Sequence, residues 1–360
     1  MLKLDNLVQA DVSVKTCVSG IQQVGIGVDD ASAYFLWLKT ALGFDVPIFD
    51  DRAPARLMTR YTGGEIHARR AILSMNLSGG GGAEIWQYTS REPQHAEKEF
   101  AWSDCGISAV KIKTTQFDKL VELNRLEDTV SLTPLQERTC WISDPYGNFF
   151  QIIESAEAFQ TLKHPGGGVC GAVITVSDMD RSLAFYQTIL GSAQVRFDEH
   201  VPLTGFPDSA GEGTYRRVLL HLSNPNTGAF SKLLGDVYLE LIQPLWINAG
   251  PSRFENRFWG DFGFIHLCLD VTLMSELKAK AGEAGYNFTV DSDGTFDMGE
   301  SGGRFCYVED PDRTLIELVE THKVPILKKW GWYLHLNKRK QQKPLPKWMI
   351  KAMGWGKIKI

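Results

Sequence analysis

Two short stretches of the sequence decide the fold, because they are variants of one phrase. "DPYGNFFQIIE" runs from Asp144 to Glu154, and "DPDRTLIELVE" runs from Asp310 to Glu320. Each begins with an Asp-Pro turn and continues as an alternating apolar run, which predicts a strand. The copies differ at one informative position, where Gln151 in the first corresponds to Glu317 in the second. A phrase that occurs twice at this spacing indicates an internal repeat.

A second recurring phrase extends the repeat. It reads "VGIGVDDASAYFLWLKTALGF" from Val24 to Phe44, and "AVITVSDMDRSLAFYQTILGS" from Ala172 to Ser192. Each copy predicts a strand, an acidic helix cap, and a helix with an aromatic pair that closes in Leu-Gly. Weaker copies begin at Ile107 and Ile265, and strand-like runs follow each helix. In the first copy these runs are "RLMTRYT" (residues 56–62), "HARRAILSMNL" and "AEIWQYT".

The chain therefore predicts an α+β fold in which a strand, a helix and three strands occur four times. We place module 1 at residues 12–95, module 2 at 100–158, module 3 at 167–248 and module 4 at 260–322. No apolar run of the 360 residues approaches the roughly 20 that a membrane-spanning helix needs. The start lacks the features of a secretory signal, and the six cysteines are scattered without a CxxC pair. These features predict a cytoplasmic protein with reduced thiols.

Strand alternation identifies side chains that face away from the helices. In the first strand, Val24 and Ile26 share the face that the following helix would cover, so Gln23 points to the opposite, concave face. The same alternation turns His266 and Glu317 to that face. Glu84 and Glu240 occupy matching places in the final strands of modules 1 and 3.

These repeats resemble the vicinal oxygen chelate superfamily. Its members include glyoxalase I, methylmalonyl-CoA epimerase, extradiol ring-cleaving dioxygenases and bleomycin-resistance proteins. The resemblance covers about Ile21 to Thr321. It implies that modules pair into curled sheets around a cavity, which usually holds one divalent metal ion. Ligands in this family come from the start of the first strand and the middle of the last strand of each module.

The family positions fall on eight residues of this chain. They are Gln23 and Glu84 in module 1, Ile107 and Gln151 in module 2, Gly171 and Glu240 in module 3, and His266 and Glu317 in module 4. Pairing neighbouring modules gives two incomplete ligand sets. Pairing module 1 with 4, and 2 with 3, assembles Gln, Glu, His and Glu, the ligand order of glyoxalase I, and leaves an inner set poor in ligands. We therefore predict half-barrels 1+4 and 2+3, with one metal site between Gln23, Glu84, His266 and Glu317.

This ligand set implies a reaction class. It suits one octahedral Zn, Ni, Co, Mn or Fe(II) ion with two positions left for vicinal oxygens of a small-molecule substrate. The metal would stabilise an enediolate while a carboxylate moves the proton, with Glu317 as base and Glu84 as its partner. The prediction is a metal-dependent lyase or isomerase of glyoxalase or epimerase type. The alternatives are an extradiol-type dioxygenase, which favours Fe(II) and a second histidine, and a metal-free small-molecule binding protein of bleomycin-resistance type.

The sequence departs from glutathione-dependent glyoxalases at two positions. Those enzymes place an arginine four residues after the first ligand and an asparagine four after the second, where this chain has Gly27 and Tyr88. We expect Trp86 and Tyr88 to line the site instead and to favour a bulkier or more apolar substrate. Arginines of module 1, including Arg69 and Arg70, are candidates to meet a substrate carboxylate, or are ordinary strand residues.

The tail at residues 323–360 differs in charge from the rest of the chain. It has 11 Lys or Arg and no acidic residue, whereas the remainder has 27 basic and 43 acidic residues. Its aromatic residues include Trp330, Trp332, Tyr333, Trp348 and Trp355. Two interpretations remain open: peripheral contact with an anionic membrane, or a strap across the acidic body with tryptophans in grooves between modules. No recognition motif for nucleic acid occurs, and the oligomeric state is left open.

Overall fold

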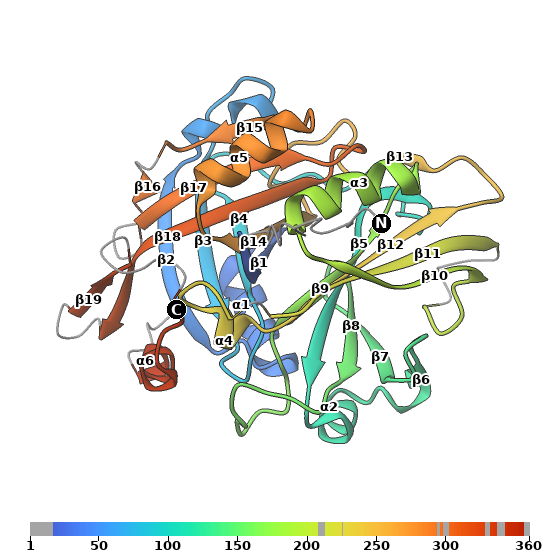
Figure 1. The fold of residues 1–360 in the computed structure, drawn as a ribbon, viewed down its shortest axis with the longest axis horizontal. Coiled ribbons are helices and arrows are strands. Elements are labelled where there is room, and N and C mark those ends of the chain that lie inside the picture. Colours follow the sequence, from blue (N-terminus) through green and yellow to red (C-terminus); the bar gives the residue numbers. More distant parts are fainter. Residues whose placement is uncertain are drawn as a thin grey trace, which may run out of the picture.

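A computed structural model shows two strongly curved sheets with helices on their outer faces (Figure 1). It describes residues 17–207, 213–224, 226–293, 296–297, 302–327, 332–336 and 343–355. In spatial order, the first sheet contains β15 (Phe288–Asp291), β17 (Gly302–Glu309), β18 (Leu315–Leu327), β14 (Gly263–Val271), β1 (Val18–Val28), β4 (Gly82–Tyr88), β3 (Ala68–Met75) and β2 (Val46–Pro54). The short strands β16 (Phe296–Asp297) and β19 (Trp332–His335) pair with β17 and β18.

The second sheet has the same plan. Its strands are β10 (Gln194–Pro202), β11 (Thr214–Leu222), β12 (Val237–Pro244), β9 (Val169–Thr175), β5 (Asp104–Thr114), β8 (Phe149–Glu154), β7 (Arg138–Ser143) and β6 (Ser131–Leu132). The short β13 (Gly250–Ser252) pairs with β5. At the centre of each sheet two strands far apart in sequence pair antiparallel, β1 with β14 and β5 with β9. The first and last quarters of the chain thus share one sheet, and the two middle quarters share the other.

Two of the helices begin at an acidic cap that the sequence predicts. Asp30 Oδ1 accepts hydrogen bonds from Ser32 N and Ala33 N at the start of α1, and Asp178 accepts one from Arg181 N at the start of α3. The helices are α1 (Ala31–Ala41), α2 (Phe117–Asn124), α3 (Met179–Leu190), α4 (Ser231–Leu234), α5 (Met274–Glu283) and α6 (Lys347–Ala352), with 3₁₀ turns η1 (Arg56–Tyr61), η2 (Glu127–Thr129) and η5 (Met353–Trp355). Within the described ranges, every helix is too short or too polar to span a membrane.

Alternation predicts the core correctly in β1. Val24, Ile26 and Val28 lie under α1 in one apolar cluster with Tyr34 and Leu38, and all five are buried. All six cysteines are free thiols, and five of them are buried.

The expectation of a strand at residues 56–62 is wrong. This segment forms the 3₁₀ turn η1, whose bonds include Met58 N to Ala55 O and Thr62 N to Thr59 O. The strand of this unit lies earlier, at β2, and ends at Pro54. Short runs that mix apolar and polar residues fit a turn as well as a strand, and the proline at the end of β2 favours the break.

Part of the tail packs on the body. Residues 323–327 continue β18, which pairs with β19, and Leu345 N donates to Ala229 O. Leu345, Ile350 and Ala352 are buried in an apolar cluster with Leu77, Phe230 and Leu233. The strap interpretation expects tryptophans in grooves, but Trp348 and Trp355 are 54% and 72% exposed, so aliphatic side chains make this contact. Trp330 and the side chain of Trp332 lie outside the described residues, and contact with lipid stays a prediction.

Candidate metal centre

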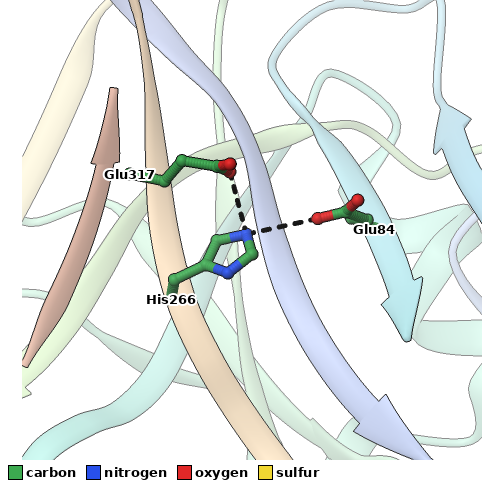
Figure 2. A group of neighbouring side chains, drawn as sticks. All are labelled: Glu84, His266 and Glu317. Carbon is green, nitrogen blue, oxygen red and sulfur yellow. Dashed lines mark ion pairs between the residues drawn. The ribbon is translucent and has the colours of Figure 1, made fainter. Parts of the chain in front are cut away.

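Four neighbouring strands bring four of the predicted site residues together. Gly25 of β1 pairs with Glu84 of β4 on one side and with His266 of β14 on the other. Glu317 on β18 follows on the far side of β14, opposite Cys268. One donor atom from each of Glu84, His266 and Glu317 lies within 4.8 Å of the others. Figure 2 shows both carboxylates directed at the imidazole from separate strands.

Gln23 completes the group. Its Nε2 donates to Glu84 Oε2 at 3.1 Å and to Glu317 Oε2 at 3.2 Å. His266 Nε2 lies 3.4 Å and 3.1 Å from the same two oxygens. All four residues are buried, with exposed fractions of 7% or less. One imidazole, one amide and two carboxylates therefore converge on one small volume.

The unsatisfied atoms of this group fit a bound cation. Gln23 Oε1 is buried without a hydrogen-bond partner, and His266 Nε2, although close to two carboxylates, is not aligned for a hydrogen bond. An amide can exchange the places of its oxygen and nitrogen, which would turn Gln23 Oε1 toward the carboxylates as a donor atom. Buried polar atoms usually have hydrogen-bond partners. Two unpartnered atoms in one group of side chains therefore fit a site for a cation. Imidazole nitrogen and hard oxygens are ligands that divalent metal ions accept.

The ionisation of these groups is coupled. Burial lowers the pKa of His266, but the carboxylates of Glu317 and Glu84 outweigh it and raise that pKa to about 9. For Glu317, burial raises the pKa, and the neighbouring His266 more than offsets this, so that the pKa lies below its ordinary value. The protonated imidazole of His266 and the carboxylate of Glu317 therefore stabilise each other.

Sequence reasoning missed three residues that hold His266 in place. Tyr307 Oη lies 3.2 Å from His266 Nδ1, which leaves Nε2 for the centre of the group. Trp259 stacks on the other side of the ring at an interplanar angle of 16°. Gly25 is required beneath the ring, because a Cβ there would overlap the imidazole. The sequence contained a signal for Tyr307, because it lies two residues from Glu309 in β17 and therefore on the same face of the strand. Nothing in the sequence pointed to Trp259.

The segment that precedes β14 covers Gly27 and Tyr88, the two positions at which glutathione-dependent glyoxalases have an arginine and an asparagine. A Cβ at Gly27 would overlap the backbone oxygen of Asp261, and Tyr88 donates its hydroxyl to the carbonyl of Trp259. Asp261 is fixed by Arg91, whose Nη1 lies 2.6 Å from Oδ1. Neither position can therefore reach an anionic substrate in this conformation.

The other candidate residues of module 1 contact other groups of the protein near the site. Trp86 packs edge-to-face on Trp259 at 4.1 Å between ring centroids, and its side chain and that of Tyr88 stand outside the cavity described below. Their contact with a substrate therefore stays a prediction. Arg69 binds Asp51 at 2.5 Å and Arg70 binds Asp50 at 2.7 Å, so both have carboxylate partners within the protein.

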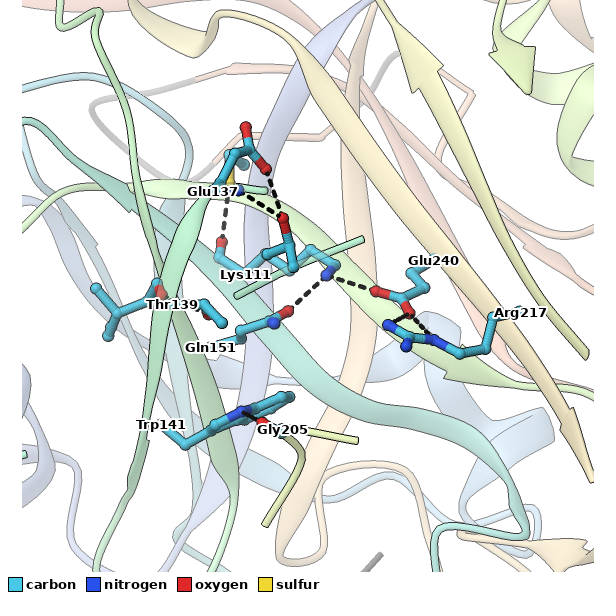
Figure 3. A network of polar contacts seen from close by, with 11 residues as sticks. Lys111, Glu137, Thr139, Trp141, Gln151, Gly205, Arg217 and Glu240 are labelled. Atoms are coloured by element: carbon cyan, nitrogen blue, oxygen red, sulfur yellow. Dashed lines mark hydrogen bonds and ion pairs between the residues drawn. The ribbon is translucent and has the colours of Figure 1, made fainter. Parts of the chain in front are cut away.

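The inner set of predicted positions contains a cation that the sequence analysis overlooked. Lys111 Nζ donates to Gln151 Oε1 at 2.5 Å and to Glu240 Oε2 at 2.8 Å, and Arg217 contacts Glu240 Oε1 through Nε and Nη2 (Figure 3). Burial raises the pKa of Glu240, but the two cations outweigh it and lower that pKa to about 2. Gly171 lies directly beside the Lys111 chain, and Ile107 is buried.

Aromatic side chains also pack together in the inner half-barrel, which the second sheet forms. Trp102 and Trp141 each pack on Phe206, at 5.0 Å and 4.9 Å between ring centroids. Trp141 Nε1 donates to Gly205 O at 2.6 Å. The inner half-barrel therefore has an internal ammonium group and a cluster of packed aromatic rings.

The outer half-barrel, which the first sheet forms, has a cavity beside the ligand group. Its volume is about 110 Å³. Three of the four converging residues, Gln23, Glu84 and Glu317, line one end of it. A small molecule in this cavity would touch the carboxylates directly.

Comparisons with known proteins agree with this geometry. Residues 168–318 match the model of the Glyoxalase/Bleomycin resistance protein/Dioxygenase superfamily. The structure of glyoxalase I from Zea mays is 14% identical with a TM-score of 0.53, covering 84% of this chain and 92% of that one. The structure of a variant of that enzyme is 13% identical with a TM-score of 0.54, covering 84% of this chain and 93% of that one. A putative dioxygenase from Bacillus subtilis is 14% identical with a TM-score of 0.51, covering 85% of this chain and 86% of that one. These similarities show the fold. No curated protein matches the sequence.

Proposed function

We propose that the chain is a metal-dependent lyase or isomerase of glyoxalase or epimerase type, and the premise is that residues 168–318 match the Glyoxalase/Bleomycin resistance protein/Dioxygenase superfamily. The observation that carries the proposal is the buried convergence of Glu84, His266 and Glu317 with Gln23 at the end of a cavity. These four residues would hold one divalent ion. When bound, the ion would act as a Lewis acid toward two neighbouring oxygens of the substrate.

The residues of the chain divide the remaining work. Glu317 lines the cavity and would take a proton from the substrate carbon at Oε2, then return it. Glu84 belongs to the same ligand group as Glu317 and would supply the second negative charge to the metal ion. Tyr307 and Trp259 fix the plane of His266. The burial of all four ligand side chains excludes bulk water from the reacting centre.

The alternative functions predict different donor groups or behaviour. A dioxygenase of extradiol type favours two histidines, whereas the described cluster contains one, and oxygen uptake with catechols is therefore expected to be absent. A metal-free binding protein would keep its ligand affinity after treatment with a chelator. The proposed enzyme would lose turnover with the chelator and regain it with the metal.

Metal analysis of the purified protein tests the proposal. Glu317→Gln and His266→Ala are expected to lower the bound metal per chain by roughly tenfold or more, because each removes a direct ligand. Glu240→Gln is the matched control, since it alters the corresponding glutamate of the inner half-barrel. Equal metal content in all four proteins would overturn the assignment of the site.

A further inference from the structure

We infer that the cavity beside the ligand group receives an uncharged alkyl or aryl substituent of the substrate, and that Met353 limits its length. The inference rests on the proposed function for the other end of the substrate, the vicinal oxygens. It adds the chemical class of the part that does not react. It also gives the C-terminal segment a role in specificity.

The composition of the cavity wall favours apolar groups. The lining has five polar residues, Gln22, Gln23, Glu84, Glu317 and Thr321. Apart from these and two glycines, the wall is aliphatic and aromatic, with Ile48, Phe49, Leu73, Met75, Phe230, Leu233, Leu234, Val319, Val324 and Met353. These side chains come from β2, β3, β18, the α4 region and η5. Small-molecule sites typically combine such a wall with a few polar groups that fix orientation.

The described lining of the cavity offers no cationic side chain to an anionic substituent. Among its lining residues in the described part of the chain, Glu84 and Glu317 are charged and no lysine, arginine or histidine occurs. Arg69 and Arg70 of the same sheet bind Asp51 and Asp50. A substituent that carried a carboxylate would lose its hydration without gaining a cationic partner, which is costly.

Two segments from outside the first sheet close the cavity. Leu233 and Leu234 belong to α4, whose chain comes from the second sheet and is held by a hydrogen bond from Gly80 N to Leu233 O at 2.7 Å. Met353 belongs to η5 at the end of the tail, and α6 before it is anchored by the buried Ile350 and Ala352. Met353 therefore belongs to the part of the wall that the basic tail supplies, together with Val324 of β18.

The volume sets the size of the substituent. An apolar cavity of about 150 Å³ accommodates benzene in another protein. The value of about 110 Å³ therefore suits a short alkyl chain or one aryl ring that reaches toward the opening. A longer group would press against Met353.

Calorimetric binding of three α-hydroxy ketones to the metal-loaded full-length protein tests this inference. The probes are hydroxyacetone, 2-hydroxyacetophenone and the para-carboxylate of the latter, which share the two vicinal oxygens. We expect the aryl ketone to bind roughly tenfold or more tightly than hydroxyacetone, and its carboxylate to lose that advantage. Equal binding of the methyl and aryl ketones, or tighter binding of the carboxylate, would overturn the inference.

Two substitutions at Met353 test its part in the wall. Met353→Trp should abolish the aryl preference with the metal content unchanged, while Met353→Ala should extend the preference to a para-propyl aryl ketone. Met349→Trp is the control, because Met349 lies in the same segment and packs on the body without lining the cavity. If both tryptophan variants behave alike, Met353 does not limit the substrate.

A further pair of probes separates this inference from the proposed function. 2-Phenylethanol and its para-carboxylate lack the vicinal oxygens, so their binding reports on the cavity whether or not a metal is bound. Preference for the neutral probe supports the apolar cavity even where Glu317→Gln leaves the metal content unchanged. Absence of that preference in a protein whose metal depends on Glu317 overturns the inference and spares the proposed function.

Discussion

Tyr186 donates a 2.8 Å hydrogen bond to the carboxylate of Asp310, although the two residues belong to different halves of the molecule. Tyr186 lies in α3, beside the second sheet, and Asp310 lies in the turn between β17 and β18 of the first sheet. The same contact joins Tyr34 of α1 to Asp144 at 2.6 Å, in the turn between β7 and β8. The repeated Asp-Pro phrase therefore ties the two half-barrels together twice.

Loss of either tyrosine hydroxyl should destabilise the protein. Tyr34→Phe and Tyr186→Phe each leave a buried carboxylate without one donor, which is expected to lower the free energy of unfolding by about 1–3 kcal/mol. Denaturant unfolding measures the change. Tyr286→Phe is the control, because this partly buried tyrosine packs on Phe185 through its ring. Equal stability in all four proteins would show that the cross-sheet bonds contribute little.

Asp310 should make stability depend on pH. Burial raises its pKa to about 6, although Tyr186 and the N–H groups of Asp312 and Thr314 oppose this. The ordinary value in an unfolded chain is about 3.9, so the folded protein binds this proton more tightly. The resulting stabilisation is complete below about pH 4 and is lost as the pH rises through about 6.

The variant Asp310→Asn stays neutral at every pH and isolates this effect. The melting temperature of the variant minus that of the wild type should increase between pH 5 and pH 8. This increase corresponds to a relative gain of about 1–2 kcal/mol in the free energy of unfolding. Asp128→Asn, at an exposed position, is the control in the same measurements. A difference for Asp310→Asn that stays constant over this range would mean that Asp310 is already ionised at pH 5.

The sequence predicted the crossed pairing from two sources. Alternation and the repeat placed Gln23, Glu84, His266 and Glu317 on concave faces, and the resemblance to the ligand order of glyoxalase I then favoured joining the first and last quarters. Lys111 escaped notice, because a lysine in a strand is usually solvated and only the position of Glu240 across the sheet reveals its partner. Trp259 escaped because connector segments have no periodicity.

Removal of metal should destabilise the wild type through the ligand group. A ligand that binds only the folded state adds roughly 2.7 kcal/mol when its free concentration is 100 times its dissociation constant. Dialysis against a chelator should therefore lower the melting temperature, and readdition of the metal should restore it. His266→Ala should start lower and respond little to the chelator. A chelator response of wild-type size in His266→Ala would place the metal elsewhere.

The inner half-barrel offers the reciprocal test, because Lys111 supplies its positive charge from within the chain. Lys111→Met removes the donor to both Gln151 and Glu240, so the free energy of unfolding should fall by about 1–3 kcal/mol while the metal content stays unchanged. Lys119→Met, at an exposed site, should have little effect. In a double-mutant cycle, Lys111→Met and Glu240→Gln should be non-additive, since they disrupt one contact. Additive effects would mean that the ammonium and the carboxylate stabilise the fold independently, and loss of metal in Lys111→Met would mean that the two half-barrels are not separate sites.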